Sequence, residues 1–432
     1  MIHLQLKLND MDFIEELRWR NVLHDLTPGA IERLAAGPAK GYIGFDPTAR
    51  SLTIGNYVQI MTLTRFQLAG HQPIVLMGGA TGRIGDPSGK DEERELKSIE
   101  EIESNLEHQA KQMKKFLRFE GKNNAIMVNN YDFYKEMNVL EFLRVAGKTL
   151  TVNYMLSKDS VKNRLESGLS FTEFSYQILQ AYDFQCLFQQ LGCEFQMGGS
   201  DQWGNITSGT EFIRRNLSSK AFAVTTNLLT KSDGKKFGKS EKGNIWLDPE
   251  MTTPYQFYQF WINTDDADLP AFFRIFSLKS KEEIISIEAA YNGQPNFLKQ
   301  KLADELTARV HSQESLEAAR SVSELLFGKL ADKNTLLNMS EGALQLVSNE
   351  IPSINIPPEK LVKGINIIDL LTEHTNILSS KGEARKALMN NAISINKEKI
   401  TEFEHIIKSD SLLHHRYIMV ENGKKNKYII KI

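Results

Sequence analysis

The sequence predicts an α/β protein with a doubly wound parallel-sheet domain, followed by a helical domain and a small α+β domain. Two apolar runs near the N-terminus enclose an amphipathic helix, which is the β-α-β pattern of a parallel sheet. From Pro254 to about Lys329, helical periodicity replaces strand patterns. Three prolines within residues 351–358 then suit an extended linker. The length of 432 residues agrees with two or three domains.

The elements expected in the first domain alternate between strands and helices. A glycine, Gly70, follows the first helix and suits its C-cap. The expected ranges are Gly41–Phe45 (strand), Ile54–Ala69 (helix), Pro73–Met77 (strand), about Ser98–Phe119 (helix), Ala125–Val128 (strand), mixed helical segments to Gln190, and Glu194–Met197 (strand). In the helical domain, Leu302–Ser321 is periodic throughout.

Composition excludes several classes of protein. The chain is 41% hydrophobic and 25% charged with a net charge of -2, which is ordinary for a globular protein and unlike a disordered or collagen-like one. No run of about 18 apolar residues predicts a membrane span, and the start of the chain lacks a signal-peptide pattern, so we expect a cytoplasmic protein. The two cysteines, Cys186 and Cys193, have neither disulfide-scaffold nor zinc-site spacing. No protein-bound metal is expected.

The segment Asp46–Asn56 lies at the first strand-to-helix junction. A helix N-terminus offers unpaired N–H groups, and Gly55 allows a ligand close to the backbone, so a nucleotide site is plausible there. The alternative is that Ser51 or Thr53 is a plain helix cap. The position in the first β-α turn favours the binding interpretation, because ligands bind at the carboxyl ends of parallel strands.

Two further stretches combine glycine with positive charge. Gly78–Lys90 is rich in glycine but lacks the spacing of a P-loop, and Asp91 stands where that motif needs Ser or Thr. It is either a glycine-rich turn or a loop whose Lys90 and Arg94 reach phosphates. The run Lys235–Ser240 is either a solvated loop or a cation clamp for a polyphosphate.

The segment Phe171–Phe184 carries a polar stripe on an otherwise apolar helix. Tyr176, Gln180 and Asp183 are spaced i, i+4 and i+7, which places them on one face. They form either a hydrogen-bonded structural cluster or a pocket for a small polar ligand with an ammonium and a hydroxyl group.

In this order, the four stretches resemble the class I aminoacyl-tRNA synthetases, and specifically the bacterial-type tyrosyl-tRNA synthetases. Thr53-Ile-Gly-Asn56 matches the family's His-Ile-Gly-His motif, and Lys236-Phe-Gly-Lys-Ser240 matches its Lys-Met-Ser-Lys-Ser loop. The combination of Tyr42–Asp46, Ser175–Asp183 and Gly199–Asn205 favours the tyrosyl over the tryptophanyl enzymes.

The resemblance implies a ligase that activates L-tyrosine with ATP and Mg²⁺ and transfers the tyrosyl group to tRNA(Tyr). It also implies a homodimer and no membrane partner. The implied domains are a Rossmann-like catalytic domain with a helical insertion (1–245), a helical anticodon-side domain (246–330), a linker (331–358) and a ribosomal-protein-type RNA-binding domain (359–432).

The resemblance also implies roles for individual residues. Phosphate-binding and catalytic roles fall to Lys236, Lys239, Lys90, Arg94, Thr48 and Thr53. Tyrosine binding falls to Tyr42 and Asp183 at the phenol, to Asp86, Tyr176 and Gln180 at the ammonium group, and to Gln196 and Gln202 near the carboxylate. ATP binding falls to Gly44, Asp46, Gly55, Asn56, Gly199, Asp201, Phe237 and Lys239.

The C-terminal segment suits contact with RNA phosphates. Residues 351–432 carry 13 Lys and Arg against 9 Asp and Glu, a mildly basic balance. A Ser-capped helix displays Lys381, Arg385 and Lys386, which we expect to bind tRNA. The alternatives are an ordinary helix surface for these cations, a tryptophanyl-type enzyme, and an RNA-binding protein that no longer activates an amino acid.

Overall fold

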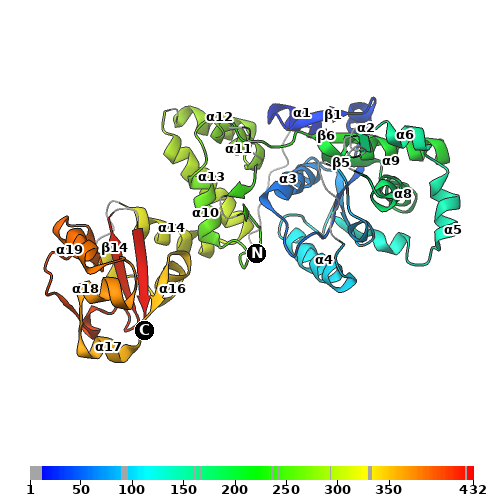
Figure 1. Cartoon of the computed structure of the whole chain (residues 1–432). Coiled ribbons are helices and arrows are strands. Elements are labelled where there is room, and N and C mark those ends of the chain that lie inside the picture. The colour runs from blue at the N-terminus through cyan, green and yellow to red at the C-terminus, as the bar shows by residue number, and fades with distance from the viewer. Residues whose placement is uncertain are drawn as a thin grey trace. The chain divides into compact units, whose positions relative to one another are not determined.

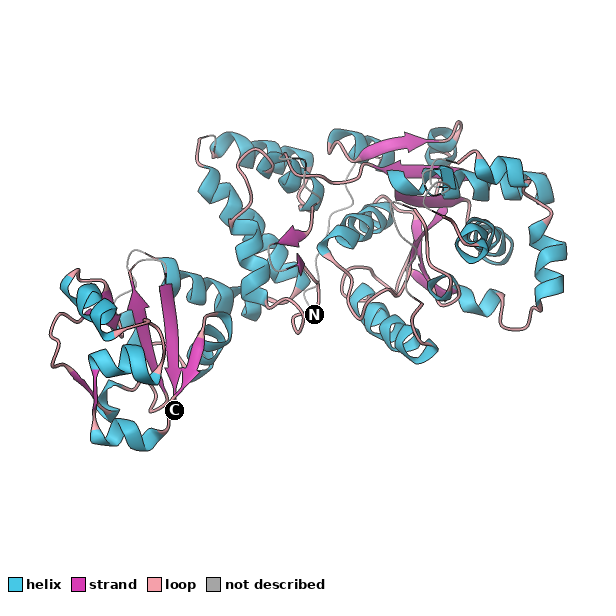
Figure 2. Cartoon of the chain, in the orientation of Figure 1, coloured by secondary structure: helices cyan, strands magenta, loops and turns pink. Residues whose placement is uncertain are grey.

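The computed structural model describes residues 12–432 except 89–95, 159–160, 163, 165–167, 233, 235–236, 241–242, 292, 329–332 and 424–425. The chain forms two compact units (Figure 1). The first contains Met1–Thr252 and Asn263–Leu302, and the second contains Thr253–Ile262 and Ala303–Ile432. Each unit has its own sheet, drawn in magenta in Figure 2.

The first unit is built on a six-stranded sheet in the order β1-β6-β5-β2-β3-β4. Strands β2 to β6 are parallel, and the edge strand β1 is antiparallel to β6. The bounds are β1 Leu23–Leu26, β2 Lys40–Phe45, β3 Gln72–Met77, β4 Ile126–Asn129, β5 Phe195–Gly199 and β6 Phe222–Thr226. The predicted doubly wound α/β fold is confirmed.

Helices cover both faces of this sheet. Figure 1 shows α3 and α4 on one side and α8 and α9 on the other. The helices of the first unit include α1 Phe13–Trp19, α2 Ala30–Ala35, α3 Ile54–Leu68, α4 Ile99–Met113, α5 Val139–Phe142, α6 Val152–Leu156, α8 Phe171–Leu191, α9 Trp203–Leu217, α11 Leu269–Phe276 and α12 Lys281–Ala290. Chain order reverses between β5 and β2, and doubly wound folds bind ligands in the crevice at the carboxyl ends of the strands beside such a reversal.

Local signals explain where several helices begin and end. Thr53, Ser98 and Ser170 are the N-caps of α3, α4 and α8, and Gly192 ends α8 in the left-handed conformation. The expected helix Ser98–Phe119 ends earlier, at Met113. The side chain of Gln67 bonds both the backbone N–H and the carbonyl of Arg118, and these tertiary bonds hold the chain out of the helix.

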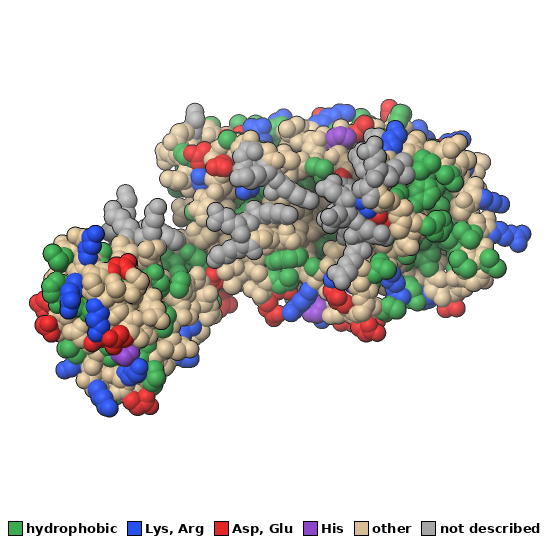
Figure 3. Space-filling model, viewed as in Figure 1, with side chains coloured by type: hydrophobic (Ala, Val, Ile, Leu, Met, Phe, Trp, Pro, Cys, Tyr) green, Lys and Arg blue, Asp and Glu red, His purple; other side chains and the backbone are tan. Residues whose placement is uncertain are grey.

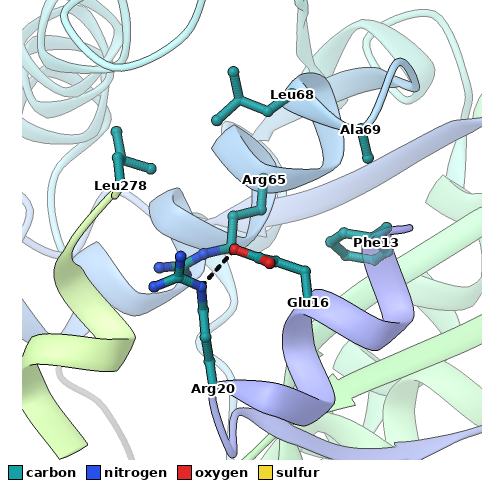
Figure 4. Close-up of a pocket in the computed structure, with 7 residues that line it drawn as sticks. All are labelled: Phe13, Glu16, Arg20, Arg65, Leu68, Ala69 and Leu278. Atoms are coloured by element: carbon teal, nitrogen blue, oxygen red, sulfur yellow. Dashed lines mark hydrogen bonds and ion pairs between the residues drawn. The ribbon is translucent and has the colours of Figure 1, made fainter. Parts of the chain in front are cut away.

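Two buried arginines fasten α11 to the sheet domain within the first unit. Arg20 donates to the carbonyls of Arg274, Ser277 and Lys279, and Arg65 donates to those of Ile275 and Ser277. These carbonyls lie at or just beyond the end of α11, where a helix leaves acceptors unpaired and favours cations. Glu16 pairs with Arg20 at 2.6 Å, as the dashed line in Figure 4 shows. Both arginines also line the small pocket drawn there, together with Phe13, Glu16, Leu68, Ala69 and Leu278.

The chain between the two sheets is helical, as the periodicity predicts. The bounds are α10 Pro254–Ile262, α13 Pro295–Val310, α14 Gln313–Phe327, α15 Lys333–Leu337 and α16 Glu341–Glu350. The periodic stretch Leu302–Ser321 is not one helix. Ser312 adopts an extended backbone and caps α14 by accepting from the N–H of Ser315, which separates α13 from α14.

The second unit contains a five-stranded sheet in the order β12-β11-β14-β15-β9 and a two-stranded sheet of β10 and β13. Its bounds are β9 Ser353–Asn355, α17 Pro358–Lys363, β10 Ile365–Asn366, α18 Ile367–Asp369, α19 Lys381–Met389, β11 Ile393–Ile395, β12 Glu398–Lys399, β13 Ile406–Ile407, β14 Tyr417–Asn422 and β15 Asn426–Lys431.

Strand β14 buries side chains on both faces, so the C-terminal sheet shares a core with helices. Tyr417 and Met419 pack with Leu325 of α14 and Val347 of α16. Ile418 and Val420 face the opposite core, and this alternation follows the two-residue period of a strand.

The proline-rich stretch differs from the extended linker that its composition suggests. Residues Ser353–Asn355 pair in parallel with Ile429–Lys431 as the edge strand β9. The prolines flank this strand, where the absence of their N–H groups costs no ladder bond. The expected domain boundaries stay a prediction. Within the described residues, no helix is both long and apolar enough to cross a membrane.

Candidate functional site

Most of the predicted small-molecule site residues converge on the crevice where the strand order reverses. Asp46 follows β2, the turn Gly78–Thr81 follows β3, and Asp201 follows β5. Because β2, β3 and β5 are parallel, their carboxyl ends meet at one edge of the sheet. The polar face of α8 contributes Tyr176 and Asp183 through the bonds described below.

The buried end of the site contains a carboxylate held by two donors. Asp183 is 1% exposed and accepts a bond of 2.6 Å from the Tyr134 hydroxyl and one of 2.9 Å from Nδ2 of Asn130. Burial raises the pKa of Asp183 to about 7, although both hydrogen bonds oppose this rise. Asp183 therefore titrates near neutrality in the folded protein.

Tyr42 lies in the same buried region. It is 1% exposed, and burial followed by the charge of Asp183 raises its pKa well above the ordinary tyrosine value. Its hydroxyl is buried and has no hydrogen-bond partner among the described residues. An orphaned buried hydroxyl costs free energy, and a ligand's polar group would relieve that cost.

Both carboxylate oxygens of Asp46 accept hydrogen bonds from described residues. Thr81 donates to Oδ1 at 2.7 Å, and Tyr176 donates to Oδ2 at 2.9 Å. Gly78 lies so close that a Cβ there would come within 2.1 Å of Asp46 Oδ1. The chain after β3 must therefore carry glycine at this position for the two loops to approach each other.

A second polar cluster borders the crevice. Asp86 accepts from Nε2 of Gln202 at 2.7 Å, and Asn205 donates to Oε1 of Gln180 at 3.2 Å. Gln196, in β5, is buried beside Tyr42 in the ladder, and its Oε1 has no bond to any described residue. These side chains form a network of acceptors and donors that suits an ammonium group and a carboxylate.

The first β-α turn combines open and capped positions. Gly44 is exposed within β2, and a Cβ there would meet no described atom within 4 Å, so open space lies over this face. Thr48 and Gly55 are exposed. Thr53 and Asn56 form a capping box: Asn56 Oδ1 accepts from the Thr53 N–H and hydroxyl at 3.0 and 2.8 Å.

The segment Phe237–Ser240 passes against the start of α3. Gly238 has φ of +83°, and a Cβ there would come within 2.8 Å of Ile54. The Phe237 ring is buried and stacks with Phe276 at 5.5 Å and meets Phe272 edge-on at 4.8 Å. The Phe237 side chain therefore anchors the segment. The backbone of the next residue, Gly238, lies beside Gly55 at the start of α3.

Some predicted residues cannot be placed. Lys90, Arg94 and Lys236 lie outside the described residues, as does the side chain of Lys239, whose backbone belongs to β7 (Lys239–Ser240). β7 pairs with β8, Gly243–Asn244. Asp201 lies half-buried in the turn after β5, and Gly199 is buried at the end of that strand.

The three predicted tRNA-binding cations lie on α19, in the second unit. Ser380 is its N-cap, as the sequence indicates. Lys381 forms ion pairs of 2.7 Å with both Asp369 and Glu373. Arg385 and Lys386 are exposed and pair with no acidic side chain in the described part of the chain. Positive charge on this helix is therefore most available at the latter two.

Asn130 and Tyr134, which hold Asp183 from the segment after β4, are not among the residues predicted from the sequence. Asn130 also donates to Thr81 at 3.0 Å and accepts from the N–H of Ala80 at 2.7 Å, so it links three parts of the site. A signal was present, because a polar residue directly after a parallel strand belongs to the ligand-binding edge. Among the described residues, no group of three or more His, Cys, Asp or Glu could hold a metal ion.

Family models match two parts of this chain. Residues 35–328 match the family described as "tRNA synthetases class I (W and Y)", and residues 344–430 match the "Tyrosine--tRNA ligase SYY-like C-terminal domain". A protein named tyrosine–tRNA ligase from Cytophaga hutchinsonii is 53% identical over 425 residues, covering 97% of this chain and 99% of its own length. A protein of the same name from Bacteroides fragilis is 48% identical over 428 residues, with the same coverage.

A solved structure agrees. The C-terminally truncated mitochondrial tyrosyl-tRNA synthetase of Aspergillus nidulans matches with a TM-score of 0.66 and 30% identity, covering 73% of this chain and 94% of that one.

Proposed function

This chain belongs to the tyrosine–tRNA ligases of the class I aminoacyl-tRNA synthetases, and we propose that its crevice binds tyrosine and ATP side by side for adenylate formation. In this reaction the tyrosine carboxylate attacks the α-phosphate of ATP and pyrophosphate leaves. The tyrosyl group then passes to the terminal ribose of tRNA(Tyr). The full-length relatives disfavour both alternatives, a tryptophan enzyme and an RNA-binding protein without ligase activity.

The observation that carries the tyrosine proposal is the pair of buried polar groups at the end of the crevice. The Tyr42 hydroxyl lacks a partner among the described residues, and Asp183 lies close enough to raise its pKa. A phenol can donate to the Asp183 carboxylate and accept from Tyr42. An amino acid without that hydroxyl leaves the Tyr42 hydroxyl unpaired, at about 1–3 kcal/mol, and gives Asp183 no donor beyond Tyr134 and Asn130.

The other end of the amino acid fits the second polar cluster. Asp86, Tyr176 and Gln180 would hold the ammonium group through a carboxylate, a hydroxyl and an amide oxygen. Gln196 and Gln202 would lie towards the substrate carboxylate. In the structure, the Oε1 atom of Gln196 is unpaired among the described residues. To bind the substrate carboxylate, the same side chain would present its NH₂ group, which donates hydrogen bonds.

ATP would occupy the open side of the crevice. Gly44 leaves space over β2, and the exposed Gly55 lets adenosine approach the start of α3, where the helix dipole favours negative charge. Asn56 and Gly199 would line this nucleotide site. Asp201 would bind the ribose hydroxyls, and Asp46 either these or the ammonium group. Mg²⁺ would enter with ATP as part of the substrate.

The chemistry needs charge and alignment more than proton transfer. The attacking carboxylate is already ionised, so catalysis comes from positioning and from cations that stabilise the phosphates. We assign this to Lys236, Lys239, Lys90 and Arg94, with Thr48 at the γ-phosphate. The backbone at Phe237 would pass beside ATP. Thr53, whose hydroxyl is bonded within the capping box, would contribute mainly by fixing the start of α3.

Two partners complete the proposal. Arg385 and Lys386, with a smaller share from Lys381, would contact tRNA phosphates. A second copy of the chain would cover an apolar patch on α5, α6 and the start of α8, where hydrophobic side chains gather in Figure 3. Leu140 and Phe171 of this patch are 74% and 77% exposed, and contiguous exposure of this kind marks interaction sites. We expect the reaction to take place in the cytoplasm.

The test is ATP–pyrophosphate exchange by the purified chain with tyrosine, tryptophan or phenylalanine as the amino acid. We expect exchange with tyrosine alone, a severe loss for Lys239→Ala, and a larger KM for tyrosine in Asp183→Asn. Thr53→His measures what a charge at that position adds. Gln190→Met, on an exposed turn of α8, is the control and should match the wild type. Exchange with tryptophan, or none with any amino acid, contradicts the proposal.

A further inference from the structure

Three amide side chains on α4 form hydrogen bonds with the loop that follows β2. Asn105, Gln109 and Gln112 are spaced i, i+4 and i+7, so they line one face of the helix. They are 5%, 1% and 7% exposed, and we call them the amide ladder. A row of three buried amides on one helix face is unusual enough to need an explanation, because each carries polar atoms that must be satisfied.

Each residue of the amide ladder forms hydrogen bonds with the loop between β2 and α3. Asn105 donates to the carbonyl of Pro47 at 3.1 Å, and Gln109 donates to that of Ala49 at 2.8 Å. Gln112 accepts from the N–H of Leu52 at 3.0 Å and donates to the Ser51 hydroxyl at 2.9 Å.

These bonds bracket Thr48. Pro47 directly precedes Thr48 in the chain, and Ala49 directly follows it. The carbonyls of these two residues accept the bonds from Asn105 and Gln109. Both are held from α4, while the Thr48 N–H bonds back to the carbonyl of Asp46 at 2.8 Å. The Thr48 side chain itself is exposed. Its position at the crevice therefore depends on a scaffold that the side chain does not touch.

We infer that Asn105 and Gln109 are positioning residues for Thr48 in adenylate formation. This inference rests on the proposed function, in which Thr48 contacts the γ-phosphate of ATP. Small displacements of a group that binds a transition state lower the rate strongly, because catalysis here relies on alignment. Gln112 acts in the same way on Leu52, which directly precedes Thr53, the N-cap of α3.

The bonding of Gln109 supports a role in alignment more than in stability. Its Oε1 is buried and has no partner among the described residues, although its Nε2 is bonded. A buried acceptor without a partner costs free energy, so an apolar side chain of the same length would suit folding about equally well. What such a side chain lacks is the donor to Ala49.

The test is a double-mutant cycle between Gln109→Met and Thr48→Ala, read by tyrosine-dependent ATP–pyrophosphate exchange and by melting temperature. We expect Gln109→Met to lower kcat/KM for ATP about tenfold while KM for tyrosine and the melting temperature stay near wild type. In the Thr48→Ala background the same change should have little further effect, because the two residues act as one unit. Asn105→Leu should repeat this pattern, and Gln190→Met is the matched control.

The outcomes separate the two levels of the proposal. If the wild type shows no tyrosine-dependent exchange, the proposed function fails. If the wild type is active but the effects of Gln109→Met and Thr48→Ala multiply independently, or kcat/KM for ATP is unchanged in Gln109→Met, the positioning role is wrong. If Gln109→Met does not fold, the role of Gln109 in alignment is wrong. The role of Asn105 is then decided by Asn105→Leu, which must lower kcat/KM for ATP at a melting temperature near that of the wild type.

Discussion

The hydroxyl of Tyr134 donates a hydrogen bond of 2.6 Å to the carboxylate of Asp183. Asp183 is buried and Tyr134 is half-buried, and the two residues are 49 positions apart in sequence. The Tyr134 hydroxyl also lies 2.9 Å from the carbonyl of Leu179, one turn before Asp183 on α8. Tyr134 therefore orients the acid that, in our proposal, receives the substrate phenol.

We predict that Tyr134→Phe weakens tyrosine binding and leaves ATP binding unchanged. The substitution keeps the ring and removes one donor to Asp183, and a hydrogen bond to a charged group contributes about 1.5–3 kcal/mol. KM for tyrosine should rise about tenfold in the exchange assay. Tyr131→Phe, on the same short segment, should have no such effect. An unchanged KM in Tyr134→Phe contradicts the role in orientation.

The raised pKa of Asp183 predicts how the stability of the ligand-free protein changes with pH. In the folded state this pKa is about 7, against 3.8 for an ordinary aspartate, so the folded protein binds the proton more tightly. The resulting stabilisation is complete below the unfolded pKa and is lost as pH rises through about 7. The melting temperature should therefore fall as pH rises from about 4 to about 7, and part of that fall should disappear in Asp183→Asn.

The exposed carboxylate of Asp132 offers the control for this measurement. Asp132→Asn should keep the wild-type dependence on pH, because that side chain is 57% exposed. Equal slopes for wild type and Asp183→Asn would show that Asp183 does not titrate in this range.

Tyr42→Phe should affect stability and tyrosine binding in opposite directions. The substitution removes a buried hydroxyl that has no partner among the described residues, which should stabilise the ligand-free protein by about 1 kcal/mol. It also removes a bond to the substrate phenol, so KM for tyrosine should rise and selectivity against phenylalanine should fall. Thermal melting and competitive exchange assays measure the two effects. A destabilised protein would indicate that the hydroxyl is paired in the ligand-free state.

Arg20→Met should be strongly destabilising. Arg20 is 1% exposed, and its loss removes the buried ion pair between Arg20 and Glu16 and one of the two cations that cap the end of α11. Breaking a buried pair in this way costs about 3–5 kcal/mol. The double variant with Glu16→Gln should recover part of the loss. Arg18→Met breaks the exposed pair with Glu15 and should cause little change in melting temperature, which makes it the matched control.

Arg385→Ala should weaken tRNA binding more than Lys381→Ala. The Lys381 ammonium group already pairs with Asp369 and Glu373, which partly neutralise it, whereas Arg385 is free of ion pairs within the described residues. Titrations of tRNA over a range of salt concentrations should show a smaller salt slope for Arg385→Ala by about one unit. Tyrosine-dependent exchange without tRNA should be unchanged in both variants. Equal losses of affinity contradict the distinction.

Features that depend on short-range patterns can be predicted from the amino-acid sequence. The β-α-β order, the caps at Thr53 and Ser380 and the common face of Tyr176 and Asp183 all follow from residue type and helical or strand period. These signals are local because each involves residues within about two turns of one another. The resemblance to the family also rests on short motifs, and the matched relatives confirm it.

The contacts by which distant segments support those features depend on the folded chain. Asn130 and Tyr134 reach Asp183, and Gln109 reaches Ala49, because the order of strands in the sheet brings their segments together. No periodicity in the sequence encodes such a contact. The early end of α4 and the pairing of β9 with β15 have the same cause, since bonds to remote residues outweigh weak local preferences for helix or linker.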